Sequence, residues 1–276
     1  AGAGRTEAAE KPDLMLLTAL PLVWGELGPL DASSRPAAAF KSLEREFAVR
    51  PLDVLDRTSL GSGTLLLLAQ PRALAPTEFV ALDDWVRNGG RALILTDPQL
   101  IWPSELPLGD IRRPPAIGLL GPVLEHWGLR LDPPAEPRAK VEQISSDSAN
   151  RRLVMFAPGR LSSNTRLCTV ALHAALADCR IGKGRAIVLA DADMLHDRLW
   201  VGPVGSGTER HTRLADNPLV VADQLDALAG VKRERLAGNV QWFDPAADRR
   251  LAVALGLFPL LLAATPAIAR TIRRRR

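Results

Sequence analysis

Tyrosine is absent from this 276-residue chain, and cysteine occurs only twice. Two cysteines, Cys168 and Cys179, are too few for a disulfide-rich scaffold or a four-cysteine metal site. They would form one bridge that closes a short loop in an oxidising compartment, and would stay as two inert thiols in a reducing one. The sequence leaves both states of this candidate disulfide open.

A strong charge imbalance is also missing. The formal net charge is +4, but five arginines lie among residues 270–276, so the rest of the chain is close to neutral. A basic face for nucleic acid is therefore not predicted. Apolar residues make up 47% and charged residues 24% of the chain, which is typical of a globular protein and excludes wholesale disorder.

Motifs of common catalytic and cofactor-binding sites are missing as well. The stretch RLCTVALH lacks the Gly-x-Cys-x-Gly turn that would expose Cys168 as a nucleophile beside His173. Residues 202–207, GPVGSG, follow no strand and precede no Lys-Ser or Lys-Thr, so a flexible loop is a better interpretation than a phosphate-binding loop. We therefore predict no cofactor and no catalytic residue.

Residues 65–98 give the clearest structural signal, LLLLAQPRALAPTEFVALDDWVRNGGRALILTDP. An apolar run is followed by an amphipathic helix that starts at Pro76 and ends at the Gly89-Gly90 pair. A second apolar run then ends at Asp97. This order predicts a strand, a crossover helix and a parallel strand, and hence an α/β fold with a mostly parallel sheet flanked by helices.

Other segments carry the same signals on a smaller scale. Strands are predicted at 14–22, 49–55, 129–131, 153–157, 168–172 and 187–190, and helices at about 36–47, 119–127 and 217–229. Residues 133–150 are polar and lack periodicity, so they predict a connector. No internal repeat is present.

Polar residues follow several of the predicted strands. Gln70 and Asp97 end two neighbouring strands, Trp102 lies in the Pro-rich loop after Asp97, and Asp191 and Asp193 follow the strand at 187–190. Ligands bind α/β proteins at loops beyond the carboxyl ends of parallel strands. These five residues are therefore the candidate ligand-binding residues.

The aspartates and His196 could also hold a divalent cation or act as acid and base. We favour a simpler interpretation, in which the aspartates cap turns and His196 lies in a loop. No second His or Glu lies at ligand spacing, so no metal site is predicted.

The two ends of the chain differ from its middle. Residues 1–13 predict a flexible lead-in and 14–235 an α/β domain, followed by a juxtamembrane segment at 236–250. Residues 251–269 carry no charge over a length that spans a bilayer core, and a basic tail, 270–276, follows. We predict a C-terminal transmembrane helix, with a hydrophobic helix packed on the protein's own core as the alternative. The arginine tail favours a cytoplasmic C-terminus and a folded domain outside the cytoplasm.

Three stretches together resemble GldG-like auxiliary components of ABC-type transport systems: residues 65–98, GKGRAIVLADADMLHDRLW and NPLVVADQLDALAG. The resemblance runs in order through most of residues 14–230. It implies a class I glutamine-amidotransferase-like fold without the catalytic cysteine. It also implies a bacterial inner-membrane protein with a periplasmic domain, a cytoplasmic tail, lipid contact through the C-terminal helix, and permease and ATPase subunits as partners.

Three functions are compatible with these features. The leading hypothesis is a non-enzymatic, membrane-anchored auxiliary or ligand-binding component of an ABC-type transport system. The alternative is a hydrolase or transferase that uses Asp97, Asp191 and Asp193 at the carboxyl edge of the sheet. The third is a purely structural envelope protein. Convergence of the three carboxylates on an open pocket would favour the enzyme, whereas hydrogen bonds to their own loop backbones would disfavour it.

Overall fold

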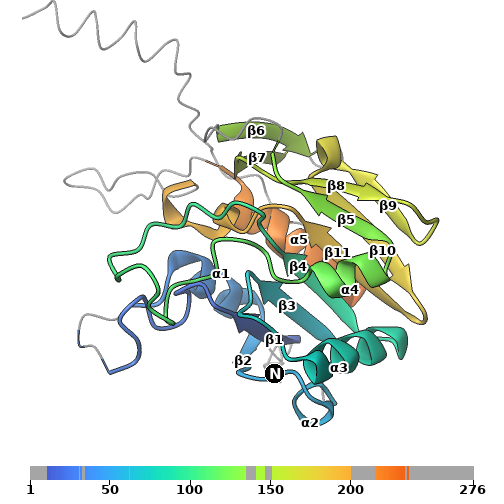
Figure 1. Cartoon of the computed structure of the whole chain (residues 1–276), viewed down its shortest axis with the longest axis horizontal. Coiled ribbons are helices and arrows are strands. Elements are labelled where there is room, and N and C mark those ends of the chain that lie inside the picture. The colour runs from blue at the N-terminus through green and yellow to red at the C-terminus, as the bar shows by residue number, and fades with distance from the viewer. Residues whose placement is uncertain are drawn as a thin grey trace, which may run out of the picture. The chain divides into compact units, whose positions relative to one another are not determined.

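Four parallel strands form the centre of the fold (Figure 1). Their side chains are apolar on both faces of the sheet. The four strands are β1 (Asp13–Thr18), β3 (Leu65–Ala69), β4 (Arg91–Leu95) and β11 (Gly184–Leu189). At one edge β2 (Ala48–Pro51) pairs in parallel with β1, and at the other β10 (Leu176–Ile181) and β9 (Cys168–Ala171) pair antiparallel. The strand order of this seven-stranded sheet is β2-β1-β3-β4-β11-β10-β9.

The structure is a computed structural model. It describes residues 11–30, 32, 35–61, 63–134, 141–146, 151–199, 215–233 and 235. The predicted transmembrane helix at 251–269, with the segments 236–250 and 270–276 beside it, lies outside these residues. None of the described helices is long and apolar enough to cross a membrane.

Helices cover both faces of the sheet because alternate residues of each central strand point to opposite faces. Leu66, Leu68 and Ile94 belong to a buried cluster with residues of α3 (Pro76–Arg87) and α4 (Gly121–His126). On the other face α5 (Asn217–Ala229) packs on β3, β4 and β11, and α1 (Ala38–Glu46) packs beside α5. The predicted α/β class with a mostly parallel sheet is confirmed.

Shorter elements complete the described structure. A turn of helix, α2 (Arg57–Leu60), precedes β3, and β5 (Leu129–Asp132) pairs with β8 (Arg160–Ser163). β6 (Val141–Ser146) pairs antiparallel with β7 (Arg151–Phe156), and three 3₁₀ turns follow, η1 (Leu172–Ala174), η2 (Asp193–Leu195) and η3 (Asp197–Leu199). The prediction of a connector over all of 133–150 was wrong for β6, because pairing with β7 overrides its weak sequence pattern.

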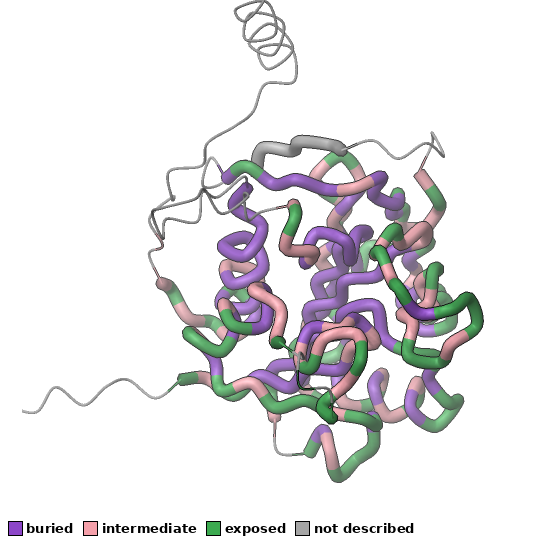
Figure 2. The backbone as a smooth tube through the Cα atoms, turned by 90° about the vertical axis from the view of Figure 1, so that its left-hand side faces the viewer, coloured by how far each residue is buried: buried purple, intermediate pink, exposed green. Residues whose placement is uncertain are grey.

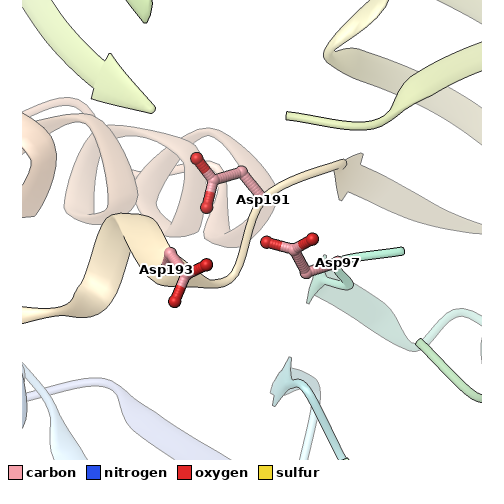
Figure 3. A group of neighbouring side chains, drawn as sticks. All are labelled: Asp97, Asp191 and Asp193. Carbon is pink, nitrogen blue, oxygen red and sulfur yellow. The ribbon is translucent and has the colours of Figure 1, made fainter. Parts of the chain in front are cut away.

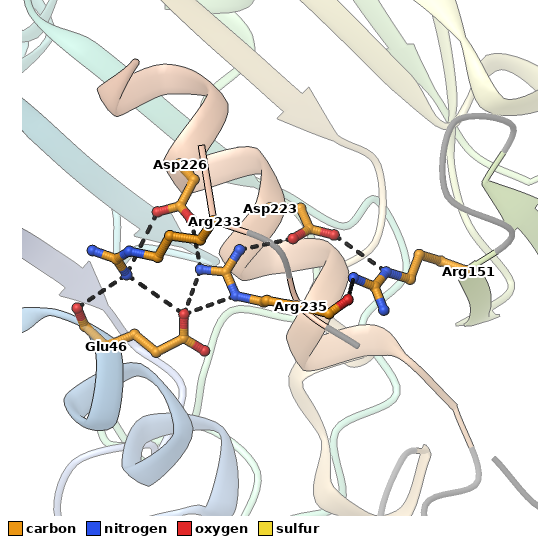
Figure 4. A network of polar contacts seen from close by, with 6 residues as sticks. All are labelled: Glu46, Arg151, Asp223, Asp226, Arg233 and Arg235. Atoms are coloured by element: carbon orange, nitrogen blue, oxygen red, sulfur yellow. Dashed lines mark hydrogen bonds and ion pairs between the residues drawn. The ribbon is translucent and has the colours of Figure 1, made fainter. Parts of the chain in front are cut away.

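An ion-pair network holds the chain that follows α5 (Figure 4). The guanidinium of Arg235 donates to Asp223 and Asp226 of α5, each at 2.7 Å, and to Glu46 at the end of α1 at 2.8 Å. Arg151 at the start of β7 donates to the carbonyl of Arg235 at 2.8 Å. The last described residue is thereby fixed to two helices and one strand.

Gly184 offers a test of how tightly α3 and the sheet pack. A Cβ at this position would lie 2.0 Å from the carbonyl oxygen of Val86 and 2.3 Å from that of Gly90, both backbone atoms that cannot move aside. We expect Gly184→Ala to lower the free energy of unfolding by roughly 1–3 kcal/mol in urea titrations. The control is Gly121→Ala, where a Cβ meets nothing within 4 Å, and equal stability of the two variants would contradict the packing.

Candidate functional site

Gln70 ties the ends of β3 and β4 together. Its side chain is fully buried, and its Oε1 accepts the N–H of Asp97 at 2.8 Å. Its Nε2 donates to the carbonyls of Asp97 at 3.2 Å and Pro115 at 2.9 Å. All these partners are backbone groups, so this candidate ligand-binding residue anchors the loop after β4.

Three aspartates gather where β4 and β11 end (Figure 3). The two strands pair in parallel with Leu95 opposite Leu189, so Asp97 and Asp191 each follow two residues later at the same level of the sheet. Asp193 lies at the start of η2. One oxygen from each carboxylate lies within 4.8 Å of the others. Such a set of oxygens could ligate a divalent cation, which the sequence spacing alone did not predict.

Backbone N–H groups bind these carboxylates from several segments. Asp97 accepts from Gln99 at 2.7 Å and from Ala192 at 3.3 Å. Asp191 accepts from Met194 at 2.9 Å and from Phe156 at 2.7 Å, and Asp193 accepts from Ile101 at 2.8 Å. The three aspartates therefore cap turns and loops, as expected, and their carboxylates also converge.

Burial controls the ionisation of all three acids. It raises the pKa of Asp97 to about 7, with a further increase from the charge of Asp193. Burial raises the pKa of Asp191 well above its usual range, and the charge of Asp97 adds to this effect. Burial also raises the pKa of Asp193, to about 6. Three negative charges are therefore not held here together at neutral pH.

A cavity of about 260 Å³, here called the edge cavity, opens beside Asp193. Its apolar lining comes from Ile101, Pro103, Phe156 and Leu199, and its polar lining from Asp193, His196 and Arg198. Asp97 and Asp191 are fully buried and do not line it. Of the three aspartates, Asp193 alone therefore borders this cavity.

Trp102 contacts His196, which lines the edge cavity. The two rings meet edge to face, with centroids 4.7 Å apart. The Nδ1 atom of His196 accepts the N–H of Arg198 at 3.1 Å, and burial lowers the pKa of the ring. The neutral ring consequently carries its proton on Nε2. Sequence reasoning did not select Arg198, Phe156 or Ile101, since no motif marks them.

Exposed residues lie on the outside of the described chain, around a buried interior (Figure 2). Two loops at the same edge of the sheet carry most of the large apolar side chains that are exposed among the described residues. Residues 19–37 follow β1 and residues 99–118 follow β4, and Glu26 Oε2 accepts the N–H of Glu105 at 3.0 Å. Leu30, Leu108 and Ile111 are at least 90% exposed. We call this set the edge surface: Trp24, Leu27, Leu30, Ile101, Leu108, Ile111 and Ile117.

Cys168 and Cys179 lie opposite each other on β9 and β10 and form a disulfide. Both side chains are buried, and Cys168 stands on an antiparallel strand. The structure therefore places this cysteine in a cross-strand pair and away from any strand-to-helix turn.

The protein has an α/β fold. At the carboxyl edge of its sheet lie a buried cluster of three acids, the edge cavity and the apolar edge surface. The chain belongs to a family of auxiliary components described as "ABC-type uncharacterized transport system", whose model matches residues 11–151. Membership implies association with components of such a system. Comparison with curated proteins gives no match.

One solved structure shares the fold at low sequence identity, and two others align with lower scores. The mmIFT52 N-terminal domain aligns with a TM-score of 0.50 and 13% identity over 82% of this chain and 100% of that domain. The exo-beta-1,4-mannosidase Op5Man5 from Opitutaceae bacterium strain TAV5 aligns with a TM-score of 0.41 and 12% identity over 67% of this chain and 32% of its own. A beta-galactosidase from Bacillus circulans sp. alkalophilus has a TM-score of 0.41 and 13% identity, over 82% of this chain and 32% of the enzyme. These likenesses concern the fold alone.

The raised pKa of Asp193 makes stability depend on pH. Because the folded pKa of about 6 exceeds the usual 3.8, unfolding releases a proton, and the free energy of unfolding falls as pH rises from about 4 through about 6. Asp193→Asn keeps an oxygen for the Ile101 N–H and removes the buried charge. We expect this variant to gain about 1–3 kcal/mol over the parent near pH 8 and little near pH 4 in urea titrations.

The matched control is Asp53→Asn, which changes an exposed side chain and should leave the pH profile unchanged. A loss of stability in Asp193→Asn that is equal at both pH values would show that the hydrogen bond outweighs the charge.

Proposed function

We propose that this chain is a GldG-like, membrane-anchored auxiliary component of an ABC-type transport system, and that its folded domain acts by binding. The family match over residues 11–151 carries the proposal, because this region contains both loops of the edge surface. The candidate transmembrane helix at 251–269 would supply the anchor, and its lipid contact is part of the proposal.

The edge surface supports a protein partner. Several large apolar side chains are exposed on the two loops of this surface, and exposed apolar patches on folded domains mark interaction sites. The partner that fits is a permease subunit of the transport system, with its ATPase, because membrane-spanning subunits present apolar residues close to the bilayer. In this proposal the transported substrate reaches the edge cavity, which lies beside the edge surface.

The enzyme alternative draws support from the convergence and raised pKa values of the three acids. In that alternative the three carboxylates themselves would act as acid and base, and such groups must reach the substrate. Asp97 and Asp191 are fully buried and bound to backbone N–H groups, which leaves Asp193 as the single carboxylate at the cavity. We therefore favour a binding function over a hydrolase or transferase.

The location proposed for the folded domain is the periplasm, with the basic tail, 270–276, in the cytoplasm. The Cys168–Cys179 disulfide supports this side of the membrane, because disulfides persist in oxidising compartments and are rare in reducing ones.

Co-purification in mild detergent tests the partner. A tagged full-length chain should recover permease and ATPase subunits from the native membrane. Replacing Leu108 and Ile111 together by serine should reduce recovery about tenfold or more at little cost in stability, because both side chains are exposed. The matched control is Val80→Ser, at an exposed position on α3. Recovery of neither subunit by the parent chain would contradict the transport role.

Thiol trapping tests the compartment. In cells quenched with acid, the denatured chain should react with a maleimide reagent only after a reductant is added, because both cysteines are bridged. Cys168→Ser leaves Cys179 alone and should be labelled without a reductant, which controls for access of the reagent. Labelling of both thiols in the untreated parent chain would refute the periplasmic location.

A further inference from the structure

The edge cavity combines three chemical features that a single small molecule can satisfy. One wall is apolar and is made by Ile101, Pro103, Phe156 and Leu199. A buried carboxylate, Asp193, borders it, and the hydrogen-bond donors His196 and Arg198 lie on the same lining. A volume of about 260 Å³ is smaller than that of most drug-sized pockets, so the ligand is correspondingly small.

The acidic part of the cavity favours a cation. Asp193 is 3% exposed, and its Oδ2 accepts the N–H of Ile101 at 2.8 Å, which leaves Oδ1 for a ligand. Asp97 and Asp191 lie just behind it, with one oxygen of each within 4.8 Å of one of its own. An ammonium group placed against Asp193 would form a charge-assisted hydrogen bond with its carboxylate.

The donor part of the cavity favours an anion. Because Nδ1 of His196 accepts the Arg198 N–H, the ring can donate only from Nε2, and the ring of Trp102 packs against it. The exposed guanidinium of Arg198 provides further donors for a carboxylate. Donors and an acidic acceptor on one small cavity suit a molecule that carries both charges.

We propose that the edge cavity binds a zwitterionic amino acid with an apolar side chain. Its ammonium group lies against Asp193, its carboxylate meets His196 and Arg198, and its side chain packs on Phe156, Ile101 and Leu199. This assignment rests on the proposed binding function and specifies its ligand.

L-Leucine is the probe, added to the full-length chain in lipid nanodiscs and measured by saturation-transfer NMR and calorimetry. Two analogues each remove one charge: 4-methylpentanoate lacks the ammonium group, and 3-methylbutylamine lacks the carboxylate. Glycine lacks the apolar side chain. We expect L-leucine to bind and each of the other three to bind about tenfold or more weakly, since each loses a charge-assisted bond or an apolar contact.

Two variants locate the binding. Asp193→Asn and Arg198→Gln should each weaken L-leucine binding about tenfold or more. Arg198 is exposed, so its replacement leaves the fold intact and gives a second test that does not depend on the stability of the Asp193 variant. The matched control is Arg130→Gln, which removes an exposed arginine paired with Asp132 on β5 and should bind like the parent.

Three outcomes would overturn the assignment: no signal from L-leucine at roughly 10 mM, equal binding of 4-methylpentanoate, or unchanged binding in both variants. The test is separable from that of the transport role. A chain that binds L-leucine but recovers no transporter subunit would refute the proposed role and keep the ligand. A chain that recovers the subunits but binds no probe would refute the ligand alone.

Discussion

Three buried carboxylates accept hydrogen bonds from five backbone N–H groups, and these bonds hold the carboxyl edge of the sheet together. The N–H groups come from the loop after β4, the turn after β11 and the end of β7. The interior of a parallel sheet has no water to satisfy such groups, so the acids replace solvent as acceptors. The consequence is electrostatic, because the same burial raises the pKa values of the acids and limits how many of them carry a charge.

Much of this architecture could be predicted from the sequence because the central strands are short apolar runs between clear helix signals. The unit from 65 to 98 forms β3, α3 and β4 in the predicted order. Gln70 and Asp97 do end neighbouring strands, as predicted. Asp191 and Asp97 meet because β11 and β4 pair in parallel, a neighbourhood that the chain order does not reveal.

The remaining features depend on contacts between distant residues. β6 and β8 are short and partly polar, so their pairing partners define them and their own patterns do not. The edge cavity is similar, because Phe156 on β7, Ile101 after β4 and His196 after β11 come from three separate parts of the chain. The sequence around His196 gives no sign that the ring of Trp102 packs against the histidine.

The three aspartates have two different roles. Two of them accept hydrogen bonds from the backbone inside the protein, and the third borders the edge cavity. Asp97 and Asp191 follow paired residues of adjacent strands, and this register carries both inside the protein, where they accept from the backbone. Asp193 lies two residues farther along, on a 3₁₀ turn, and so reaches the cavity. Asp193 can therefore orient a ligand at the cavity, whereas the two buried acids cannot take part with it in acid-base chemistry there.

β7 connects this edge with the place where the described chain ends. Its first residue, Arg151, binds Asp223 and the carbonyl of Arg235, and its last residue, Phe156, binds Asp191 and lines the edge cavity. Arg235 is itself held by a half-buried ion pair with Asp223 and a buried one with Asp226, and the buried pair is costly to break because an unpaired charge would remain. β7 therefore joins the ion-pair network at its first residue to the acid cluster and the edge cavity at its last.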